Sequence, residues 1–178
     1  MKQVKLKDGK TIVIRAAEKS DAANMLEYID KISYESDNLT FGPGEFGINI
    51  EQEEEFIDNI SRQNNALFII AEHDGKIVGN LNFSSRKRPR IIHTGEFGIS
   101  ILKDYWGEGL GTELISYLID WSKNSGIIKK INLRVRTDNI PAIHLYKKLG
   151  FKVEGTISRD LRINDKFYDT FHMGLEID

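Results

Sequence analysis

Apolar residues recur along the chain with two different periods, which together predict a domain that mixes helices with strands. Helical spacing predicts helices at Ala16–Ser36, Ile50–Arg62, about Leu110 to the stop at Asn124-Ser125-Gly126, and Asn139–Leu149. Apolar runs typical of strands lie at Ala66–Glu72, Lys76–Ser84, Ile91–Leu102, Ile131–Arg136, Phe151–Ile157 and Lys166–Ile177. Val4–Arg15 is expected to form a hairpin, or one long strand broken at Asp8-Gly9.

One strand–helix–strand unit stands out in this order of elements. Two strands of one sheet that are joined by a helix run parallel, and the crossover is right-handed. Ile91–Leu102 and Ile131–Arg136 are therefore expected to be parallel. The remaining strands are expected to pair mostly antiparallel. We predict a mixed α+β fold with one mostly antiparallel twisted sheet, one parallel pair and about four helices, forming a single domain over residues 1–178.

The segment Tyr105-Trp106-Gly107-Glu108-Gly109-Leu110-Gly111-Thr112 carries the strongest chemical signal. It joins a predicted strand to an amphipathic helix, and three glycines occupy every second position. Glycine lets the backbone approach a ligand closely, and the free N–H groups at a helix start attract an anion. The segment is either a phosphate-binding loop or a plain flexible turn, and the spacing alone does not decide between them.

Two familiar phosphate loops are disfavoured. A P-loop needs Lys and then Ser or Thr after its last glycine, whereas Gly111 is followed directly by Thr112. A dinucleotide-binding loop needs a third glycine where Thr112 stands, and it follows the first strand of its unit. A nucleotide-binding protein of another fold is therefore a weak alternative.

Two blocks resemble the GCN5-related N-acetyltransferase superfamily, in particular its small bacterial members. The first block of that family has Gln or Arg, two residues, Gly, one residue, then Gly or Ala. Gly109 and Gly111 match it, whereas Trp106 stands where Gln or Arg is usual. The stretch Asn139–Gly155 resembles the family's Asn-x-x-Ala-x-x-x-Tyr-x-x-x-Gly-Phe block. The resemblance covers most of the chain and is weakest from Ser33 to Gln63.

The resemblance implies that acetyl-CoA is the co-substrate. In the family the two parallel strands splay apart and acetyl-CoA lies in the gap. The backbone of Ile99 and Ile101 would pair with the pantetheine arm, although both are also ordinary core residues. The other cofactor-binding residues implied are Trp106, Gly107, Glu108, Gly109, Leu110, Gly111 and Thr112 at the pyrophosphate, and Asn139 and Ala142 on the next helix. Asn139 is also expected to cap that helix.

The same resemblance names the catalytic candidates. Tyr146 would donate a proton to the leaving sulfur, although its helical spacing also fits a tyrosine packed in the core. Glu96 is the first candidate base for the amine, with Glu45 as a second. Either acid is as well explained as a solvated surface residue, and a water chain could replace both. The loop Tyr34–Ile50 is expected to form one wall of the acceptor pocket.

Composition narrows the function further. The 178 residues carry a formal net charge of -2, which argues against a general nucleic-acid or membrane-surface role. With no cysteine and no metal-ligand spacing among the four histidines, neither a thiolate nucleophile nor a metal site is expected. The basic loop Arg86–Arg90 is interpreted as a solvated loop, with contact to the 3′-phosphate of CoA or to an acidic partner as the alternative. Met1–Lys10 lacks the apolar core of a signal peptide, and we expect a cytoplasmic protein.

The sequence thus predicts an N-acetyltransferase that moves acetyl from acetyl-CoA directly to a primary amine in a ternary complex. The acceptor is expected to be a small molecule or a peptide N-terminus, and the protein a monomer or homodimer. A non-catalytic acyl-CoA sensor on the same fold is the alternative. Loss of turnover with binding intact in a Tyr146→Phe variant would separate the two.

Overall fold

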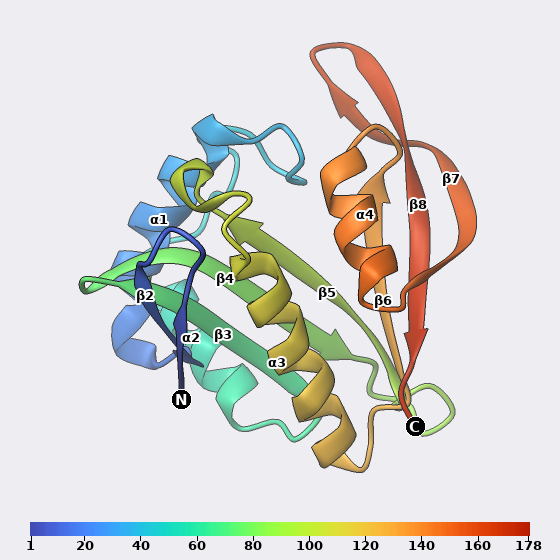
Figure 1. Ribbon diagram of the computed structural model, residues 1–178, viewed down its shortest axis with the longest axis horizontal. Coiled ribbons are helices and arrows are strands. Elements are labelled where there is room, and N and C mark those ends of the chain that lie inside the picture. The colour runs from blue at the N-terminus through green and yellow to red at the C-terminus, as the bar shows by residue number, and fades with distance from the viewer.

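The structure is a computed structural model that describes residues 1–178, and Figure 1 shows its elements. The strands are β1 (Lys2–Lys5), β2 (Thr11–Ala16), β3 (Ala66–His73), β4 (Lys76–Ser85), β5 (Thr94–Ile101), β6 (Lys130–Arg136), β7 (Lys152–Ile163) and β8 (Lys166–Glu176). The helices are α1 (Ala22–Glu35), α2 (Ile50–Ser61), α3 (Leu110–Ser125) and α4 (Ile140–Lys148), with 3₁₀ turns at Lys19–Asp21 and Lys103–Tyr105.

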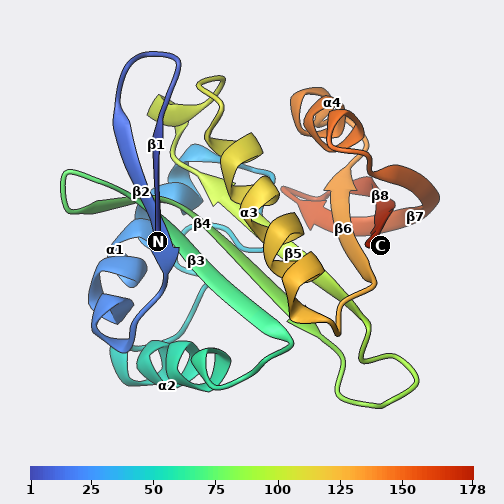
Figure 2. The same ribbon diagram turned by 60° about the horizontal axis from the view of Figure 1, so that its bottom comes forward.

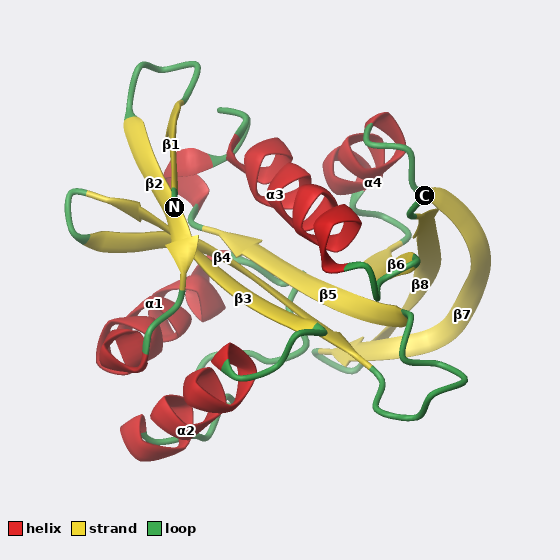
Figure 3. Cartoon of the chain, turned by 90° about the horizontal axis from the view of Figure 1, so that it is seen from below, coloured by secondary structure: helices red, strands yellow, loops and turns green.

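All eight strands form one sheet in the order β1-β2-β3-β4-β5-β6-β8-β7. Every neighbouring pair is antiparallel except β5 and β6, which are parallel. Helices α1 and α2 lie on one face of the sheet, and α3 and α4 lie on the other (Figure 3). The β1–β2 hairpin and the β7–β8 hairpin lie at opposite ends of the sheet (Figure 2). The predicted mixed α+β fold with a single parallel pair is confirmed.

The core follows from this layering. Central strand β3 is covered on both faces, so Ile69, Ile70 and Ala71 are all fully buried in succession and show no alternation. Helices α1 and α3 each bury one apolar stripe against the sheet. The buried members are Met25, Ile29 and Ile32 of α1, and Leu110, Leu114, Ile115 and Leu118 of α3.

Two predicted elements begin later than expected. The first helix starts at Ala22, because Lys19–Asp21 form a 3₁₀ turn whose Asp21 carboxylate accepts hydrogen bonds from Arg15 at 2.7 and 2.8 Å. That contact holds the pKa of Asp21 below its usual range. Strand β5 starts at Thr94, because the residues before it are held in turns, such as the one closed by the Ile91 N–H and the Arg88 carbonyl.

Strand β7 is longer than predicted and reaches Ile163. It continues by means of two bulges in its pairing with β8, the second between Ile157 and Leu161. Arg159 within that bulge has a φ of 52°, a left-handed conformation that bends the strand. The bulge brings Asp160 close to β8, where Thr170 donates a 2.6 Å hydrogen bond to its carboxylate.

Gly95 lies where β5 begins to pair with both neighbours, and its missing side chain permits that contact. A Cβ at this position would lie 2.5 Å from the Phe83 ring and 2.5 Å from the Ser84 carbonyl oxygen, and a backbone atom cannot move aside cheaply. Gly95→Ala is therefore expected to lower the free energy of unfolding by about 1–3 kcal/mol. Urea denaturation would measure it. Gly155→Ala is the control, because a Cβ there meets nothing within 4 Å. Equal stability of the two variants would contradict the prediction.

Candidate active site

The parallel strands β5 and β6 pair over only three positions and then separate. The paired residues are Thr94 with Lys130, Gly95 with Ile131 and Glu96 with Asn132. Beyond them, β5 stays paired to β4 as far as Ile101, and β6 stays paired to β8 as far as Arg136. The facing edges of the two strands therefore diverge while their outer edges remain fixed.

The backbone groups that face this gap follow from strand alternation. The N–H of Leu102 donates to the Val78 carbonyl on the β4 side at 2.9 Å. Successive residues of a strand direct their backbone groups to opposite edges. Because Leu102 faces β4, Ile99 and Ile101 face the gap. The Ile101 carbonyl accepts a 2.6 Å hydrogen bond from the Trp106 indole. The N–H groups of Ile99 and Ile101 and the Ile99 carbonyl are thus directed toward the gap without a β6 partner.

The three glycines of the loop serve two different purposes. Gly107 and Gly109 have φ values of 77° and 98°, a region that residues with a Cβ rarely adopt. Gly111 instead allows α3 and α4 to pack closely, because a Cβ there would lie 2.9 Å from the Leu145 side chain. The backbone of the loop therefore favours glycine at positions 107 and 109, whereas a Cβ at position 111 would make the Leu145 side chain shift.

The start of α3 offers unpaired donors at the same place. The first hydrogen bond of the helix runs from Glu113 N–H to the Gly109 carbonyl at 3.2 Å. The amides of Leu110, Gly111 and Thr112 come before it and have no acceptor in the helix. No side chain caps this helix start. The combination of free amides and a positive helix end suits an anion such as a pyrophosphate.

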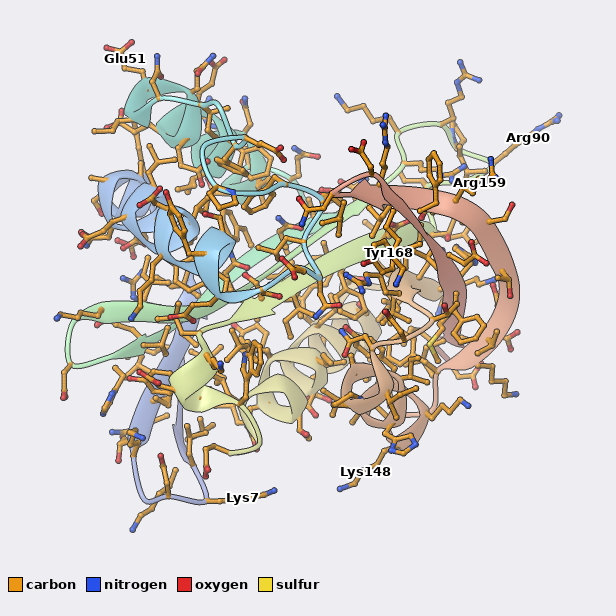
Figure 4. The ribbon with its side chains drawn as sticks, turned by 90° about the horizontal axis from the view of Figure 1, so that it is seen from above. Lys7, Glu51, Arg90, Lys148, Arg159 and Tyr168 are labelled. Atoms are coloured by element: carbon orange, nitrogen blue, oxygen red, sulfur yellow. The ribbon has the colours of Figure 1, made fainter.

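The N-terminal hairpin supports the glycine loop from the outside, which the sequence did not predict. Lys7 donates from its backbone N–H to the Glu108 carbonyl at 3.3 Å and from Nζ to the Gly107 carbonyl at 3.1 Å. The side chains of Lys7 and Lys148, the latter at the end of α4, extend toward one another near this loop (Figure 4). Lys7 thus brings a positive charge to the loop, in which Glu108 carries a negative one.

Helix α4 begins as predicted. The Asn139 side chain accepts a 3.4 Å hydrogen bond from the Ala142 N–H, so Asn139 is the N-cap. Ala142 is half-buried in the first turn and packs against the core.

Tyr146 of α4 lies in an aromatic cluster on the α3/α4 face. Its ring contacts Phe97 of β5 and Phe151, with centroid distances of 6.1 and 6.0 Å. The residue is 7% exposed, and burial raises the pKa of the phenol to about 12. Its hydroxyl has no hydrogen-bond partner in the protein. It is also not one of the fully buried polar side-chain atoms without a partner, which belong to Glu53, Ser122 and Asn132. The phenol is therefore neutral and free to donate a proton.

Glu96 lies on the opposite face of β5 from Phe97, at the last paired position. Its Oε1 accepts a 2.9 Å hydrogen bond from Arg134 Nε of β6. Arg134 Nη1 also lies 3.5 Å from Asp160 of the β7 bulge. The pKa of Arg134 is raised, chiefly by the hydrogen bond to Glu96. The first candidate base is thus half of an ion pair that spans the diverging strands, a partner that the sequence analysis missed.

Glu45, the second candidate base, lies in the loop between α1 and α2. Its carboxylate accepts a 2.7 Å hydrogen bond from the Gly42 N–H and so closes a turn of the loop itself. The same loop and α1 border an open cavity of about 160 Å³ lined by Leu26, Ile29, Asp30, Ser33, Gly42, Gly44, Phe46, Gly47 and Ile48. The predicted acceptor loop therefore borders a cavity.

Arg136 at the end of β6 ties this loop to the other half of the molecule. Its guanidinium makes two hydrogen bonds to Asp138, at 2.9 and 2.7 Å, and a third to the Asp37 carbonyl at 3.0 Å. It also stacks 3.8 Å above the Tyr168 ring of β8. The side chain is only 11% exposed. The pKa of Asp138 is lowered by this contact.

Three remaining features complete the description of the surface. No three His, Asp or Glu side chains converge as metal ligands would. None of the helices combines the length and the apolar composition that a membrane crossing requires. In the basic loop between β4 and β5, Arg90 points away from the molecule (Figure 4).

A sequence model described as the acetyltransferase (GNAT) family matches residues 32–151, which is more than half of the chain. The chain therefore belongs to this family, as the two sequence blocks predicted.

Two curated relatives illustrate the match. An L-amino acid N-acetyltransferase of Escherichia coli K12 is 34% identical over 105 residues, which cover 59% of this chain and 65% of the relative. A spermidine N(1)-acetyltransferase of the same strain is 29% identical over 124 residues, which cover 70% of this chain and 65% of the relative. The chain thus spans just under two thirds of the length of each relative.

Solved structures share the fold over nearly the whole chain. A GNAT-family acetyltransferase from Streptococcus pneumoniae has a TM-score of 0.90 and 35% identity, covering 94% of this chain and 99% of that one. A Salmonella typhimurium protein solved with its cofactor acetyl-CoA has a TM-score of 0.81, with 94% of each chain covered. At 21% identity, the second likeness shows the fold alone.

The Arg136 contacts predict a measurable effect on the acceptor loop. Arg136→Lys keeps the charge but loses the planar, two-pronged contact to Asp138 and the bond to the Asp37 carbonyl. We expect the loop over residues 37–49 to open more often, so that chymotrypsin cleaves the native protein severalfold faster at Phe41 or Phe46. Mass spectrometry of the fragments would locate the cuts. Arg162→Lys is the control, because Arg162 is exposed and contacts only Asp165 and the Phe167 ring, both within the β7–β8 hairpin. Equal cleavage of the two variants would contradict the role of Arg136.

Proposed function

We propose that the protein is an N-acetyltransferase that transfers acetyl from acetyl-CoA to a primary amine. The observation that carries the proposal is the coincidence, at one gap in the sheet, of an unpaired β5 edge, a glycine loop with free amides and a buried neutral phenol. In the reaction, an ammonium acceptor and acetyl-CoA give the acetamide, CoA as its thiol, and one proton. The fold and family support it.

The shape of the gap suits the cofactor. The pantetheine arm carries amide groups that can pair with Ile99 and Ile101 in the manner of an additional strand. The pyrophosphate then falls at the segment Trp106–Thr112, near the amides that begin α3. Asn139 and Ala142 would border the arm on the α4 side. The acetyl-CoA held by the Salmonella protein of the same fold supports this cofactor class.

The chemistry needs three proton transfers and one site of charge stabilisation. The ammonium acceptor loses a proton to Glu96, or to water ordered beside it, and the nitrogen lone pair attacks the thioester carbonyl carbon. As negative charge develops on the carbonyl oxygen, the Ile99 or Ile101 N–H can stabilise it. The carbon–sulfur bond then breaks with its electron pair on sulfur, and Tyr146 donates the proton that makes the thiol. The nitrogen gives up a second proton as the acetamide forms, and this proton restores the phenol of Tyr146.

The cofactor assignment predicts selective stabilisation by ligand. Acetyl-CoA or CoA at about a hundredfold excess over its dissociation constant should add roughly 2.7 kcal/mol to the free energy of unfolding. ATP and NAD should add far less. Calorimetry or thermal denaturation would measure the shifts. Their absence with acetyl-CoA and CoA would refute the proposed function.

A pair of variants tests the glycine loop itself. Gly109 and Gly126 flank α3 at its two ends, and both have left-handed φ values. Alanine at either position costs similar strain, about 1–2 kcal/mol. Only Gly109→Ala should also reduce the stabilisation by acetyl-CoA. If Gly126→Ala reduced it equally, the loop would not be the phosphate site.

Tyr146 gives a prediction with a pH signature. Tyr146→Phe should lower kcat by at least about a hundredfold while acetyl-CoA still binds. Because the pKa is raised to about 12, the phenol keeps its proton below that pH, and activity of the native protein should not fall through its ionisation between pH 8 and 11. Tyr117→Phe on α3 is the control. Turnover equal to native in Tyr146→Phe would remove the proton-donor role. Binding without turnover in the native protein, over a broad amine panel, would favour the sensor.

A further inference from the structure

The α1/α2 face of the gap carries one accessible pair of opposite charges. The side chains at even positions of β5 point to this face, since Ser100 bonds to Tyr28 of α1 at 2.8 Å. Glu96 lies on the same face and meets Arg134 there. The two side chains are 44% and 46% exposed. An acceptor that approaches the gap from this face encounters the pair beside the proposed position of the thioester.

Each member of the pair has unused hydrogen-bonding capacity. Arg134 uses Nε for Glu96 and Nη1, at 3.5 Å, for Asp160, and its Nη2 group has no partner. Glu96 uses Oε1, and its Oε2 accepts no hydrogen bond from the protein. A half-exposed guanidinium with free N–H groups binds a carboxylate through parallel hydrogen bonds. A free carboxylate oxygen next to it accepts from an ammonium group.

Asp160 fixes the orientation of Arg134. The β7 bulge delivers Asp160 to this position, and Thr170 holds its second oxygen at 2.6 Å. Arg134 is thus contacted on two sides, by Glu96 at 2.9 Å and by Asp160 at 3.5 Å. The arrangement places the Arg134 cation directly beside the Glu96 anion.

We propose that this pair selects a free α-amino acid as the acceptor, with Arg134 binding its α-carboxylate and Glu96 receiving its α-ammonium group. The inference rests on the proposed function and names its substrate class. An α-amino acid carries an ammonium group and a carboxylate on the same carbon. These two charges match the neighbouring Glu96 and Arg134 side chains. Once the carboxylate is held, the nitrogen lies toward the gap and beside a proton acceptor.

Other amine acceptors match the pair less well. A polyamine brings only positive charges, and Arg134 would repel its second ammonium group. Glu96 and Asp160 both already hold Arg134, so this position has no uncompensated pair of carboxylates for a diamine. A peptide N-terminus has no carboxylate next to its amine. Arg136 does not replace Arg134 as an anchor, because its side chain is 11% exposed and fully engaged.

The experiment compares acceptors that differ only in the carboxylate. CoA release would be followed with the L-amino acids, the corresponding α-carboxamides, a tripeptide and spermidine. For the preferred amino acid, kcat/KM should exceed that of its carboxamide by about 10- to 100-fold, the size expected for hydrogen bonds between charged groups. Arg134→Gln should abolish this preference mainly through KM for the acid. The KM for acetyl-CoA should remain near its native value, and the rate with the carboxamide should fall far less than the rate with the acid.

Arg134→Lys and Arg162→Gln complete the set. The lysine keeps the charge without the planar fork, so it should retain part of the preference for the acid. Arg162→Gln should retain all of it. If Arg134→Gln folds poorly, Arg134→Lys still measures how much the preference for the acid depends on the guanidinium.

Three outcomes would overturn the inference. In the first, a carboxamide or spermidine is accepted as well as any amino acid. In the second, Arg134→Gln slows the reaction with all acceptors equally, and in the third the protein binds acetyl-CoA but acetylates no amino acid. The last two leave the cofactor assignment intact. Failure of the proposed function itself would instead appear as the absence of stabilisation by acetyl-CoA and CoA.

Discussion

The separation of β5 from β6 after three paired positions is the constraint on which the site depends. Buried backbone N–H and carbonyl groups must be paired, and each one left without a partner costs about 1–3 kcal/mol. Here β4 pairs with β5 and β8 pairs with β6 over seven positions each, so both outer edges are fixed. Neither strand can move across to close the gap without losing those bonds. The fold therefore holds open a slot whose edge is ready to pair with another extended chain of amide groups.

The two faces of this slot are built differently. On the α3/α4 face, apolar rings surround Tyr146, and burial keeps its phenol protonated. On the α1/α2 face, two charged contacts cross from one half of the sheet to the other: Arg134 to Glu96, and Arg136 to the Asp37 carbonyl. The sheet lacks ladder hydrogen bonds between β5 and β6 beyond their three paired positions. Packing stabilises this region on one face, and one ion pair and one hydrogen bond from an arginine stabilise it on the other. The polar side suits a charged acceptor, and the apolar side suits a proton donor.

Local signals in the sequence were sufficient for most of the fold. The glycine at each end of α3, the Asn139 cap and the apolar periods fixed the elements to within a few residues, and the single parallel pair followed from the strand–helix–strand order. The second half of β7 was missed because Arg159 and Asp160 interrupt the apolar pattern. A bulge depends on the neighbouring strand, and no local pattern reports it.

The sequence predicted the parts of the candidate site that depend on backbone groups. It did not predict which side chains contact one another there. Glycine spacing located the loop that has free amides, because free amides depend only on φ angles and on a helix start. Glu96 was identified without Arg134, which lies 38 positions along the chain. Arg134 and Arg136 alternate with buried residues on β6, so their common face was a readable signal. Their partners on β5, the α1–α2 loop and the β7 bulge depend on tertiary structure.

Trp106 shows how a departure from the family pattern can be accommodated. A Gln or Arg at this position would offer a flexible polar group to the loop, whereas the indole offers one donor on a rigid ring. The structure directs that donor to the Ile101 carbonyl at 2.6 Å. The bond satisfies the last carbonyl of the β5 edge and anchors the start of the glycine loop to the strand. It also removes one acceptor from the β5 edge, which leaves there the N–H groups of Ile99 and Ile101 and the carbonyl of Ile99. An edge rich in N–H donors favours a ligand that brings carbonyl oxygens, and the pantetheine arm and the thioester both do.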